Sequence, residues 1–141
     1  MSEIIKNLYL GNYQDAKNMV DVDMVINCTS NLEFYAPEAK KIRIYVEDNG
    51  NEEEYKKLYD AIENNILFEE MNGMLSQNKK ILCHCMAGQQ RSAAIVTCFL
   101  IWKYKYDLFE AILFVKSKRS IAFFGNVNFM STIKHYYMGN S

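Results

Sequence analysis

The 141-residue sequence has few of the residues that break, link or anchor polypeptide chains. It contains one proline, Pro37, and six glycines, so no segment has the composition of a flexible linker. No apolar run approaches the ~20 residues that a membrane-spanning helix needs. The first residues pass directly into a mixed polar stretch, unlike a signal or transit peptide. We therefore expect one folded domain over residues 1–141, with no membrane contact and no targeting segment.

Excess charge and metal-binding patterns are also scarce. Sixteen basic and 17 acidic residues leave a formal charge of −1, which makes a nucleic-acid partner or an anionic membrane surface improbable. The two histidines and four cysteines lack the C-x-x-C spacing of zinc sites. No metal and no organic cofactor is expected. The cysteines lie in apolar segments of a domain of ordinary size, which favours a reducing, cytoplasmic location.

Apolar periodicity predicts strands that alternate with helices, followed by helices alone. Strands are predicted at residues 8–12, 24–28, 42–46 and 80–83. Helices are predicted at residues 15–19, 52–72, 92–104, from 108 to about 119, and 127–137. Two of these helices carry capping-box patterns at their starts, formed by the pairs Asn51/Glu54 and Asp107/Glu110. The order favours an α/β fold with a central, mostly parallel sheet flanked by helices.

The segment from His84 to Ser92 reads H-C-M-A-G-Q-Q-R-S and connects a predicted strand to a predicted helix. Backbone N–H groups of such a loop converge at the helix N-terminus and form an anion site. The field of that site, together with a nearby arginine, lowers the pKa of a cysteine thiol. Arg91 adds a planar fork that suits phosphate oxygens. The alternative is a purely structural role, in which Cys85 is a buried core thiol and Arg91 is a surface charge.

This loop predicts a nucleophile inside a phosphate site. Cys85 is the candidate nucleophile and Ser92 begins the helix behind it. The candidate phosphate-binding residues are Met86, Ala87, Gly88, Gln89, Gln90 and Arg91.

Hydrolysis of a phosphomonoester through a thiolate also needs a proton donor for the leaving oxygen and a base for the attacking water. Asp48 follows a predicted strand within a loop rich in Gly and Asn, and it can serve in both roles. The carboxyl ends of parallel strands share one edge of a sheet, so this loop and the Cys85 loop can meet. Glu47 is the competing candidate, because only one of two neighbouring residues on a strand faces the site. A solvated turn aspartate is the alternative reading of Asp48.

The Cys85 loop, ending in Arg91-Ser92, resembles the cysteine-dependent phosphatases and in particular the dual-specificity protein phosphatases. The resemblance extends to residues 8–12, 25–27, 42–53 and 119–129, and so covers nearly the whole chain. It implies the dual-specificity phosphatase fold and hydrolysis of phosphotyrosine and phosphoserine or phosphothreonine in phosphorylated proteins. It assigns Cys85 as nucleophile, Arg91 as phosphate clamp, Asp48 as general acid and then base, and Ser92 as hydrogen-bond donor to the departing sulfur.

The same resemblance implies supporting roles for three more residues. His84 would orient the loop and help to hold the thiolate, and Asn27 would brace the loop backbone. Cys28 would form a reversible disulfide with Cys85 that protects the thiolate from over-oxidation, although a buried, inert Cys28 is the default. Gln90 departs from the family, which usually has a small residue before the arginine, and we expect it to reshape the pocket rim.

Two other functions stay open. An RNA 5′-phosphatase would use the same chemistry, but those relatives usually have Thr-His within the loop and asparagine before the arginine, where this chain has Met86-Ala87 and Gln90. A catalytically silent phosphopeptide-binding module typically lacks the cysteine, the arginine or the acid, and all three are present here. Because the resemblance includes poxvirus members, a viral origin is a further hypothesis, with the virion or the host cytoplasm as the location.

Overall fold

A computed structural model describes residues 1–140, in which five strands form one sheet of order β1-β2-β5-β3-β4. The strands are β1 (Ser2–Ile5), β2 (Leu8–Gly11), β3 (Met24–Asn27), β4 (Lys40–Arg43) and β5 (Ile81–His84). The helices are α1 (Tyr13–Asn18), α2 (Glu52–Ile62), α3 (Ile66–Ser76), α4 (Arg91–Tyr104), α5 (Leu108–Lys118) and α6 (Met130–Gly139). Every strand pairing is parallel except that of β1 with β2. The predicted α/β class with a mostly parallel sheet is therefore confirmed.

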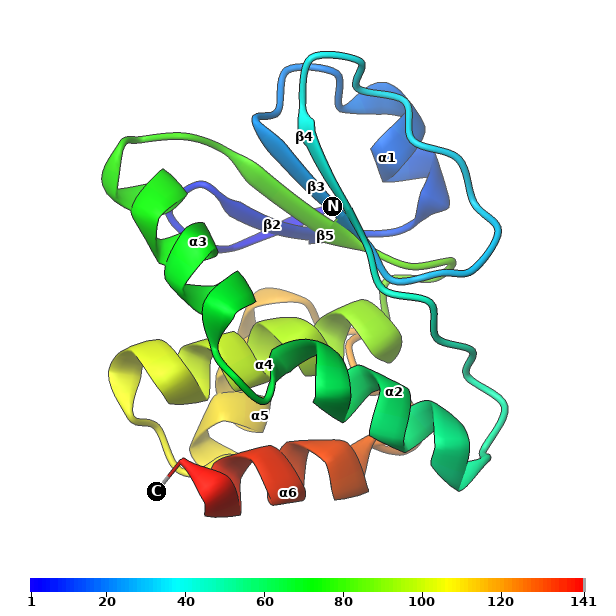
Figure 1. Ribbon diagram of the computed structural model, residues 1–141, viewed down its shortest axis with the longest axis vertical. Helices are drawn as coiled ribbons and strands as arrows, with labels where there is room; N and C mark the ends of the chain where they lie inside the picture. Colours follow the sequence, from blue (N-terminus) through cyan, green and yellow to red (C-terminus); the bar gives the residue numbers. More distant parts are fainter. Residues whose placement is uncertain (141) are drawn as a thin grey trace.

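The helices divide unequally between the two faces of the sheet (Figure 1). On one side α1 covers a small apolar cluster that includes Ala16 of the helix and Val25 and Leu82 of the sheet. On the other side α2, α4, α5 and α6 form a thick layer, and the main core lies between this layer and the sheet. Parallel strands are buried on both faces in such an arrangement, which explains why β3 and β5 are almost wholly apolar.

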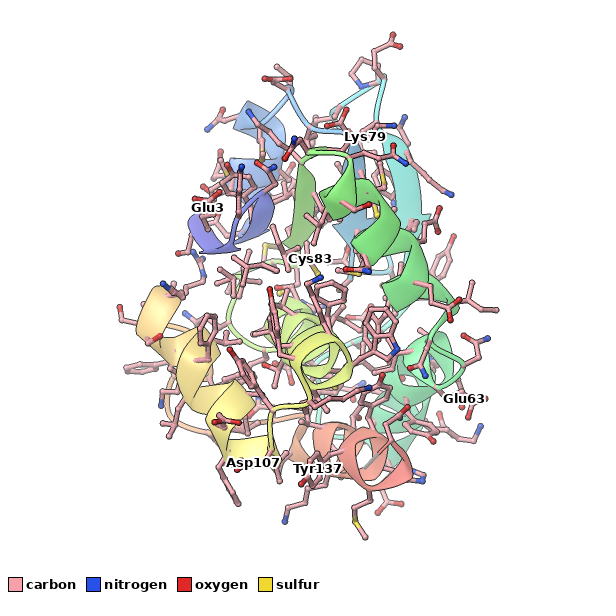
Figure 2. All side chains as sticks on the ribbon, turned by 90° about the vertical axis from the view of Figure 1, so that its left-hand side faces the viewer. Glu3, Glu63, Lys79, Cys83, Asp107 and Tyr137 are labelled. Carbon is pink, nitrogen blue, oxygen red and sulfur yellow. The ribbon has the colours of Figure 1, made fainter. Side chains whose placement is uncertain are left out.

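Helix α4 occupies the centre of the helical layer. All its residues from Ser92 to Ile101 are buried, as expected for a helix that is apolar all round. Figure 2 looks along this helix and shows neighbouring elements around it, with Cys83 of β5 where the sheet faces the helix. Because its flanks are packed, the N-terminus of α4 is held rigidly at the end of β5.

The helix predicted over residues 52–72 is instead two helices, α2 and α3, separated by residues 63–65. Asn65 adopts a left-handed conformation with φ of 63°, which an α-helix cannot contain. The side chain of Asn65 is fixed by Tyr136 and Asn140. Apart from glycine, asparagine is the residue that most readily takes this conformation. The pair Asn64-Asn65 therefore indicates a helix end, although the apolar spacing continues across it.

Three further differences concern strand and cap positions. The strand predicted at residues 42–46 ends at Arg43, because its partner β3 ends at Asn27, opposite Arg43. Strand β1 was not predicted; it is a short edge strand with one buried side chain, that of Ile4. The cap pair Asp107/Glu110 is confirmed, whereas the side chain of Asn51 makes no capping hydrogen bond. Within residues 1–140, no helix is both long and apolar enough to cross a membrane.

Candidate active site

The Cys85 loop lies at the edge where the parallel strands end. Strand β5 ends at His84, which is level with Gly11 of β2 and Asn27 of β3. Helix α4 begins at Arg91, so residues 85–90 turn directly from the sheet into the helix. The anion site predicted at a strand–loop–helix junction is therefore built from the end of a central strand and the start of a buried helix.

Arg119 holds the middle of this loop from outside. Arg119 is buried, with 7% of its surface exposed, and its Nε donates to the carbonyl of Gly88 at 2.8 Å. Its Nη2 donates to the carbonyl of Ala87 at 3.4 Å, and its Nη1 donates to Ser2 Oγ at 3.1 Å. The two loop carbonyls are therefore turned toward Arg119, which leaves the neighbouring N–H groups free to face the interior of the loop.

Backbone donors hold two more carbonyls of the loop in the same way. The N–H of Tyr13 donates to Met86 O at 3.0 Å, and the N–H of Phe123 donates to Gln89 O at 2.8 Å. Carbonyls directed outward from a tight loop leave a concave set of N–H groups, which is the geometry of an anion-binding nest. The predicted phosphate-binding residues thus share one fixed backbone shape, set by segments far apart in the sequence.

Gly88 is required by this shape. Its φ is +65°, and a Cβ atom at this position would lie 2.5 Å from the carbonyl oxygen of Gly11 and 2.7 Å from Arg119 Nη2. The first clash is with backbone that cannot move out of the sheet, so both conformation and space select glycine.

Cys85 lies at the base of the loop and is 2% exposed. Its Sγ is 3.1 Å from Ser92 Oγ. Burial raises the pKa of the Cys85 thiol, but hydrogen bonds from the side chain and backbone of Ser92, the charge of Arg91 and the N–H of Gly88 outweigh burial and lower that pKa below its ordinary value. The cysteine is therefore poised to be a thiolate, the form in which sulfur is a nucleophile.

Arg91 joins the Cys85 loop to the loop that follows β4. Its Nη1 donates to the carbonyl of Val46 at 3.1 Å and lies 4.0 Å from Glu47 Oε2. The two loops that the sequence analysis expected at one sheet edge do meet, and the arginine is their link.

The two candidate carboxylates behave differently at this edge. Glu47 accepts a hydrogen bond from Ser30 Oγ and pairs with Arg91. Asp48 points to a neutral donor instead: Asn128 Nδ2 lies 3.2 Å from its Oδ1 and 3.1 Å from its Oδ2. Only Asp48 is therefore kept apart from the arginine that a phosphate group would need.

His84 is buried directly beside the nucleophile. Its Nδ1 lies 3.3 Å from the carbonyl of Cys85, and its Nε2 is a buried atom with no hydrogen-bond partner. Burial lowers the pKa of this imidazole, which favours its neutral form. Its contact with the Cys85 carbonyl is consistent with the predicted role in orienting the loop.

Asn27 takes a different place from the predicted one. Its Oδ1 accepts hydrogen bonds from the N–H and hydroxyl of Thr29, and its Nδ2 donates to Leu32 O at 2.9 Å. These bonds stabilise the loop after β3, not the Cys85 loop. A strand-end asparagine bonds most readily to backbone a few residues ahead of it.

Cys28 is placed beside Cys83, where the prediction paired it with Cys85. The Sγ atoms of Cys28 and Cys83 are 3.9 Å apart. Ile26 is level with Cys83 in the sheet, and Cys28 lies two residues beyond Ile26 on the same face, so Cys28 is the diagonal neighbour of Cys83 and its thiol reaches back to it. The pKa of Cys83 is raised, first by burial and then by the neighbouring thiol, so the Cys83 thiol stays protonated and unreactive beside the poised Cys85.

Gln90, Arg119 and Asn128 shape the site in ways that sequence reasoning missed. The side chain of Gln90 bonds to the backbone of Asn126 and Asn128, so the residue that departs from the family connects the loop to the segment after α5. No local spacing marks Arg119 or Asn128; their only signal was the resemblance over residues 119–129. Within residues 1–140, no group of three or more His, Cys, Asp or Glu side chains is arranged to hold a metal ion.

Comparison with known proteins identifies the same family throughout. The family model "Dual specificity phosphatase, catalytic domain" matches residues 8–138. A protein of Invertebrate iridescent virus 6 named as a tyrosine phosphatase is 31% identical over 145 residues, which cover 96% of this chain and 90% of that protein. The tyrosine-protein phosphatase yvh1 of Schizosaccharomyces pombe is 29% identical over 152 residues, which cover 99% of this chain but 42% of yvh1.

A solved structure shows the same architecture. The crystal structure of human DUSP28 superimposes with a TM-score of 0.81 at 23% identity and covers 98% of this chain and 96% of that one. At this identity the likeness demonstrates a shared fold.

Proposed function

This chain belongs to the dual specificity phosphatase family, and from that premise we propose that it hydrolyses phosphotyrosine and phosphoserine or phosphothreonine in proteins through a covalent phosphate ester of Cys85. The observation that carries the proposal is the loop itself. Its carbonyls are held outward by Tyr13, Arg119 and Phe123, so its N–H groups surround a cysteine whose pKa is lowered.

In the first step the Cys85 thiolate attacks phosphorus, and the bond from phosphorus to the ester oxygen breaks. The N–H groups of the loop and the Arg91 guanidinium bind the phosphoryl oxygens, whose charge is stabilised as the bond breaks. Asp48 in its protonated form gives a proton to the departing phenoxide or alkoxide. The products of this step are a free hydroxyl on the substrate and an S-phosphocysteine on the protein.

In the second step a water molecule attacks the S-phosphocysteine. Asp48, now a carboxylate, takes a proton from this water, and the phosphorus–sulfur bond breaks to release inorganic phosphate. Ser92 Oγ, 3.1 Å from Cys85 Sγ, donates a hydrogen bond to the sulfur as it regains its negative charge. No step requires a metal ion or an organic cofactor.

The assignment of Asp48 over Glu47 is supported by the partners of each residue. Glu47 is paired with Arg91, and a phosphate that binds Arg91 competes with that pair. Asp48 is held by an amide and is exposed, so it can reach the leaving oxygen without giving up an ion pair.

Phosphorylated proteins are the proposed substrates, and acceptance of both ester types is supported by the match to the dual specificity family over residues 8–138. We place the protein in a reducing compartment such as the cytoplasm, since a reactive thiolate survives there; for a viral protein this is the host cytoplasm or the virion.

The test is hydrolysis of p-nitrophenyl phosphate with reductant and without added metal, by wild type, Cys85→Ser, Asp48→Ala and Glu47→Gln. We expect turnover by wild type and Glu47→Gln, none by Cys85→Ser, and a loss of about 100-fold or more in Asp48→Ala, the usual contribution of a general acid. Strong loss in Glu47→Gln with little in Asp48→Ala would reverse the acid assignment.

The substrate class is tested with phosphotyrosine and phosphothreonine peptides beside an RNA with a 5′-triphosphate. Turnover of both peptides supports the proposal, and preference for the RNA would favour the 5′-phosphatase alternative despite the absence of net positive charge. If wild type binds phosphopeptides and turns over no substrate, the chain is a binding module.

A further inference from the structure

The segment after α5 connects the phosphate loop to the candidate general acid through side-chain amides. Gln90, the last residue of the loop, is 8% exposed. Its Nε2 donates to Asn126 O at 2.7 Å, and its Oε1 accepts from the N–H of Asn128 at 3.0 Å. Both polar atoms of Gln90 are thus used on the same short segment, which fixes the backbone at residue 128 relative to the loop.

The side chain of Asn128 continues the connection. Its Nδ2 lies within 3.2 Å of both oxygens of Asp48, and its Oδ1 accepts from Asn126 Nδ2 at 3.3 Å. Both contacts run from Asn128 Nδ2 to oxygens that accept hydrogen bonds, so the NH2 group of Asn128 is the end of the amide that faces Asp48. The contact with Asn126 on the opposite side supports the same orientation.

A second connection reaches the same loop from the other direction. Arg91, adjacent to Gln90, donates to the carbonyl of Val46, two residues before Asp48. The segment 46–48 is therefore attached at one end to Arg91 and at the other to Asn128. Both attachments lead back to residues 90 and 91, so the position of the acid is set by the loop that binds phosphate.

We propose that Gln90 and Asn128 are positioning residues that hold Asp48 at the distance from the phosphate loop where it can protonate the leaving group. This inference rests on the proposed function and extends it to two side chains that contact neither the phosphate nor the sulfur. It explains the long side chain at position 90, because a serine there could not reach Asn126 and Asn128.

The positioning role predicts that variants at these two residues lose rate on some substrates and not on others. A positioning residue for the acid matters when the leaving oxygen needs a proton, as in phenyl phosphate or a phosphotyrosine peptide. It matters little when the leaving group is a strongly acidic phenol, as in difluoromethylumbelliferyl phosphate. Effects on binding and on the thiolate would instead lower the rates for both substrates equally.

The experiment measures kcat/KM for phenyl phosphate and for difluoromethylumbelliferyl phosphate in wild type, Asn128→Ala, Gln90→Met, Asp48→Ala and the double variant Asp48→Ala/Asn128→Ala. Methionine keeps the length and bulk of Gln90 without its hydrogen bonds. We expect Asn128→Ala and Gln90→Met to lose about 10-fold on phenyl phosphate, part of the usual general-acid contribution, and less than about 2-fold on the activated ester. Asn128→Ala is expected to add nothing when Asp48 is already alanine, since residues that act as a unit are non-additive.

Equal losses on both substrates, or additive losses in the double variant, would overturn the inference. The contact itself is tested without catalysis by the NMR signals of the Asn128 side-chain amide, which are expected to shift in Asp48→Ala. An inert wild type in which these signals shift refutes the proposed function and supports the contact; an active enzyme with unshifted signals and equal losses refutes the positioning role alone.

Discussion

Ser92 is the residue with the most direct influence on the reactivity of Cys85. Its side chain and backbone are the first of the interactions that lower the pKa of that thiol against the effect of burial. We expect Ser92→Ala to raise the pKa of Cys85, because a thiolate stabiliser is lost while the thiol stays buried. The measurement is the rate of alkylation by iodoacetamide as a function of pH, followed by peptide mapping.

The control for this variant lies on the same helix. Thr97 Oγ1 donates to Ala93 O at 2.7 Å, inside α4 and more than one turn beyond Ser92, so Thr97→Ala should leave the alkylation profile of Cys85 unchanged. Cys83 and Cys98 have pKa values raised chiefly by burial and should stay unmodified at neutral pH. An unchanged profile in Ser92→Ala would show that the charge of Arg91 and the backbone N–H groups suffice to hold the thiolate.

Gly88 gives a prediction in which steric and conformational costs can be separated. Gly88→Ala forces a Cβ to within 2.5 Å of Gly11 O at a φ of +65°, whereas Gly50 has a φ of +81° with nothing within 4 Å of an added Cβ. Backbone strain alone should cost Gly50→Ala about 1 kcal/mol of unfolding free energy, and the added clash should cost Gly88→Ala about 3 kcal/mol or more. Urea denaturation of both variants tests this; equal losses would mean that the loop relaxes around the added methyl group.

At the scale of the helix, capping makes a prediction with an internal control. The Asp107 side chain accepts from the N–H of Glu110 at 2.8 Å, while Asn51 makes no such bond at the start of α2. Asp107→Ala should therefore lower the unfolding free energy by about 1 kcal/mol, and Asn51→Ala by much less. Urea midpoints of the two variants check this, and similar shifts would show that the Asp107 bond is replaced by water at no cost.

The same two caps show where sequence patterns determine structure and where they do not. Both fit the capping-box spacing, but Glu54, the partner of Asn51, is 5% exposed and accepts instead from the N–H of Glu47 and from Lys57. Tertiary contacts with the loop after β4 thus override a local pattern. Periodicity located most helices and strands correctly, because the buried face of an element requires apolar residues at regular spacing in the sequence. It missed the break at Asn65, since the apolar positions of α2 and α3 continue across it.

At the scale of the whole molecule, the site divides into a local part and an assembled part. Cys85, Arg91 and the intervening residues are local: one strand–loop–helix unit carries them, and its sequence predicts its chemistry. The outward carbonyls depend on Tyr13, Arg119 and Phe123, which reach the loop from distant segments. Hydrogen bonds between such distant segments produce no recognisable pattern of residue spacing in the sequence. The order of the strands and the packing of α5 and the loop after it therefore come from the three-dimensional structure alone.

The last prediction concerns global stability and pH. Burial lowers the pKa of His84 from its ordinary 6.5, so His84 binds a proton more weakly in the folded state than in the unfolded chain. The stability that the neutral histidine contributes is complete above pH 6.5 and falls as pH drops toward the lower pKa of the folded state, by at most about 1.4 kcal/mol per pH unit for one proton. Glu54, whose pKa is lowered from 4.5 first by its hydrogen bond with Lys57, contributes stability that is lost only below pH 4.5. A measurement between pH 7.5 and 5 therefore excludes Glu54, and a histidine variant separates His84 from the Cys85 thiol, whose pKa is also lowered.

The single tryptophan, Trp102, packs against Phe68 and Phe99 and reports unfolding by fluorescence. We expect the unfolding free energy of wild type to decline from pH 7 to pH 5 and that of His84→Gln to start lower and stay nearly flat. His135→Gln serves as the control, because His135 stacks on Tyr59 at the surface of α6 and its replacement should preserve the decline. Histidine is the side chain whose ordinary pKa lies in this range, and a thiol titrates here only when its pKa is lowered. A decline that persists in His84→Gln would therefore assign the acid sensitivity to the Cys85 thiolate and not to the buried imidazole.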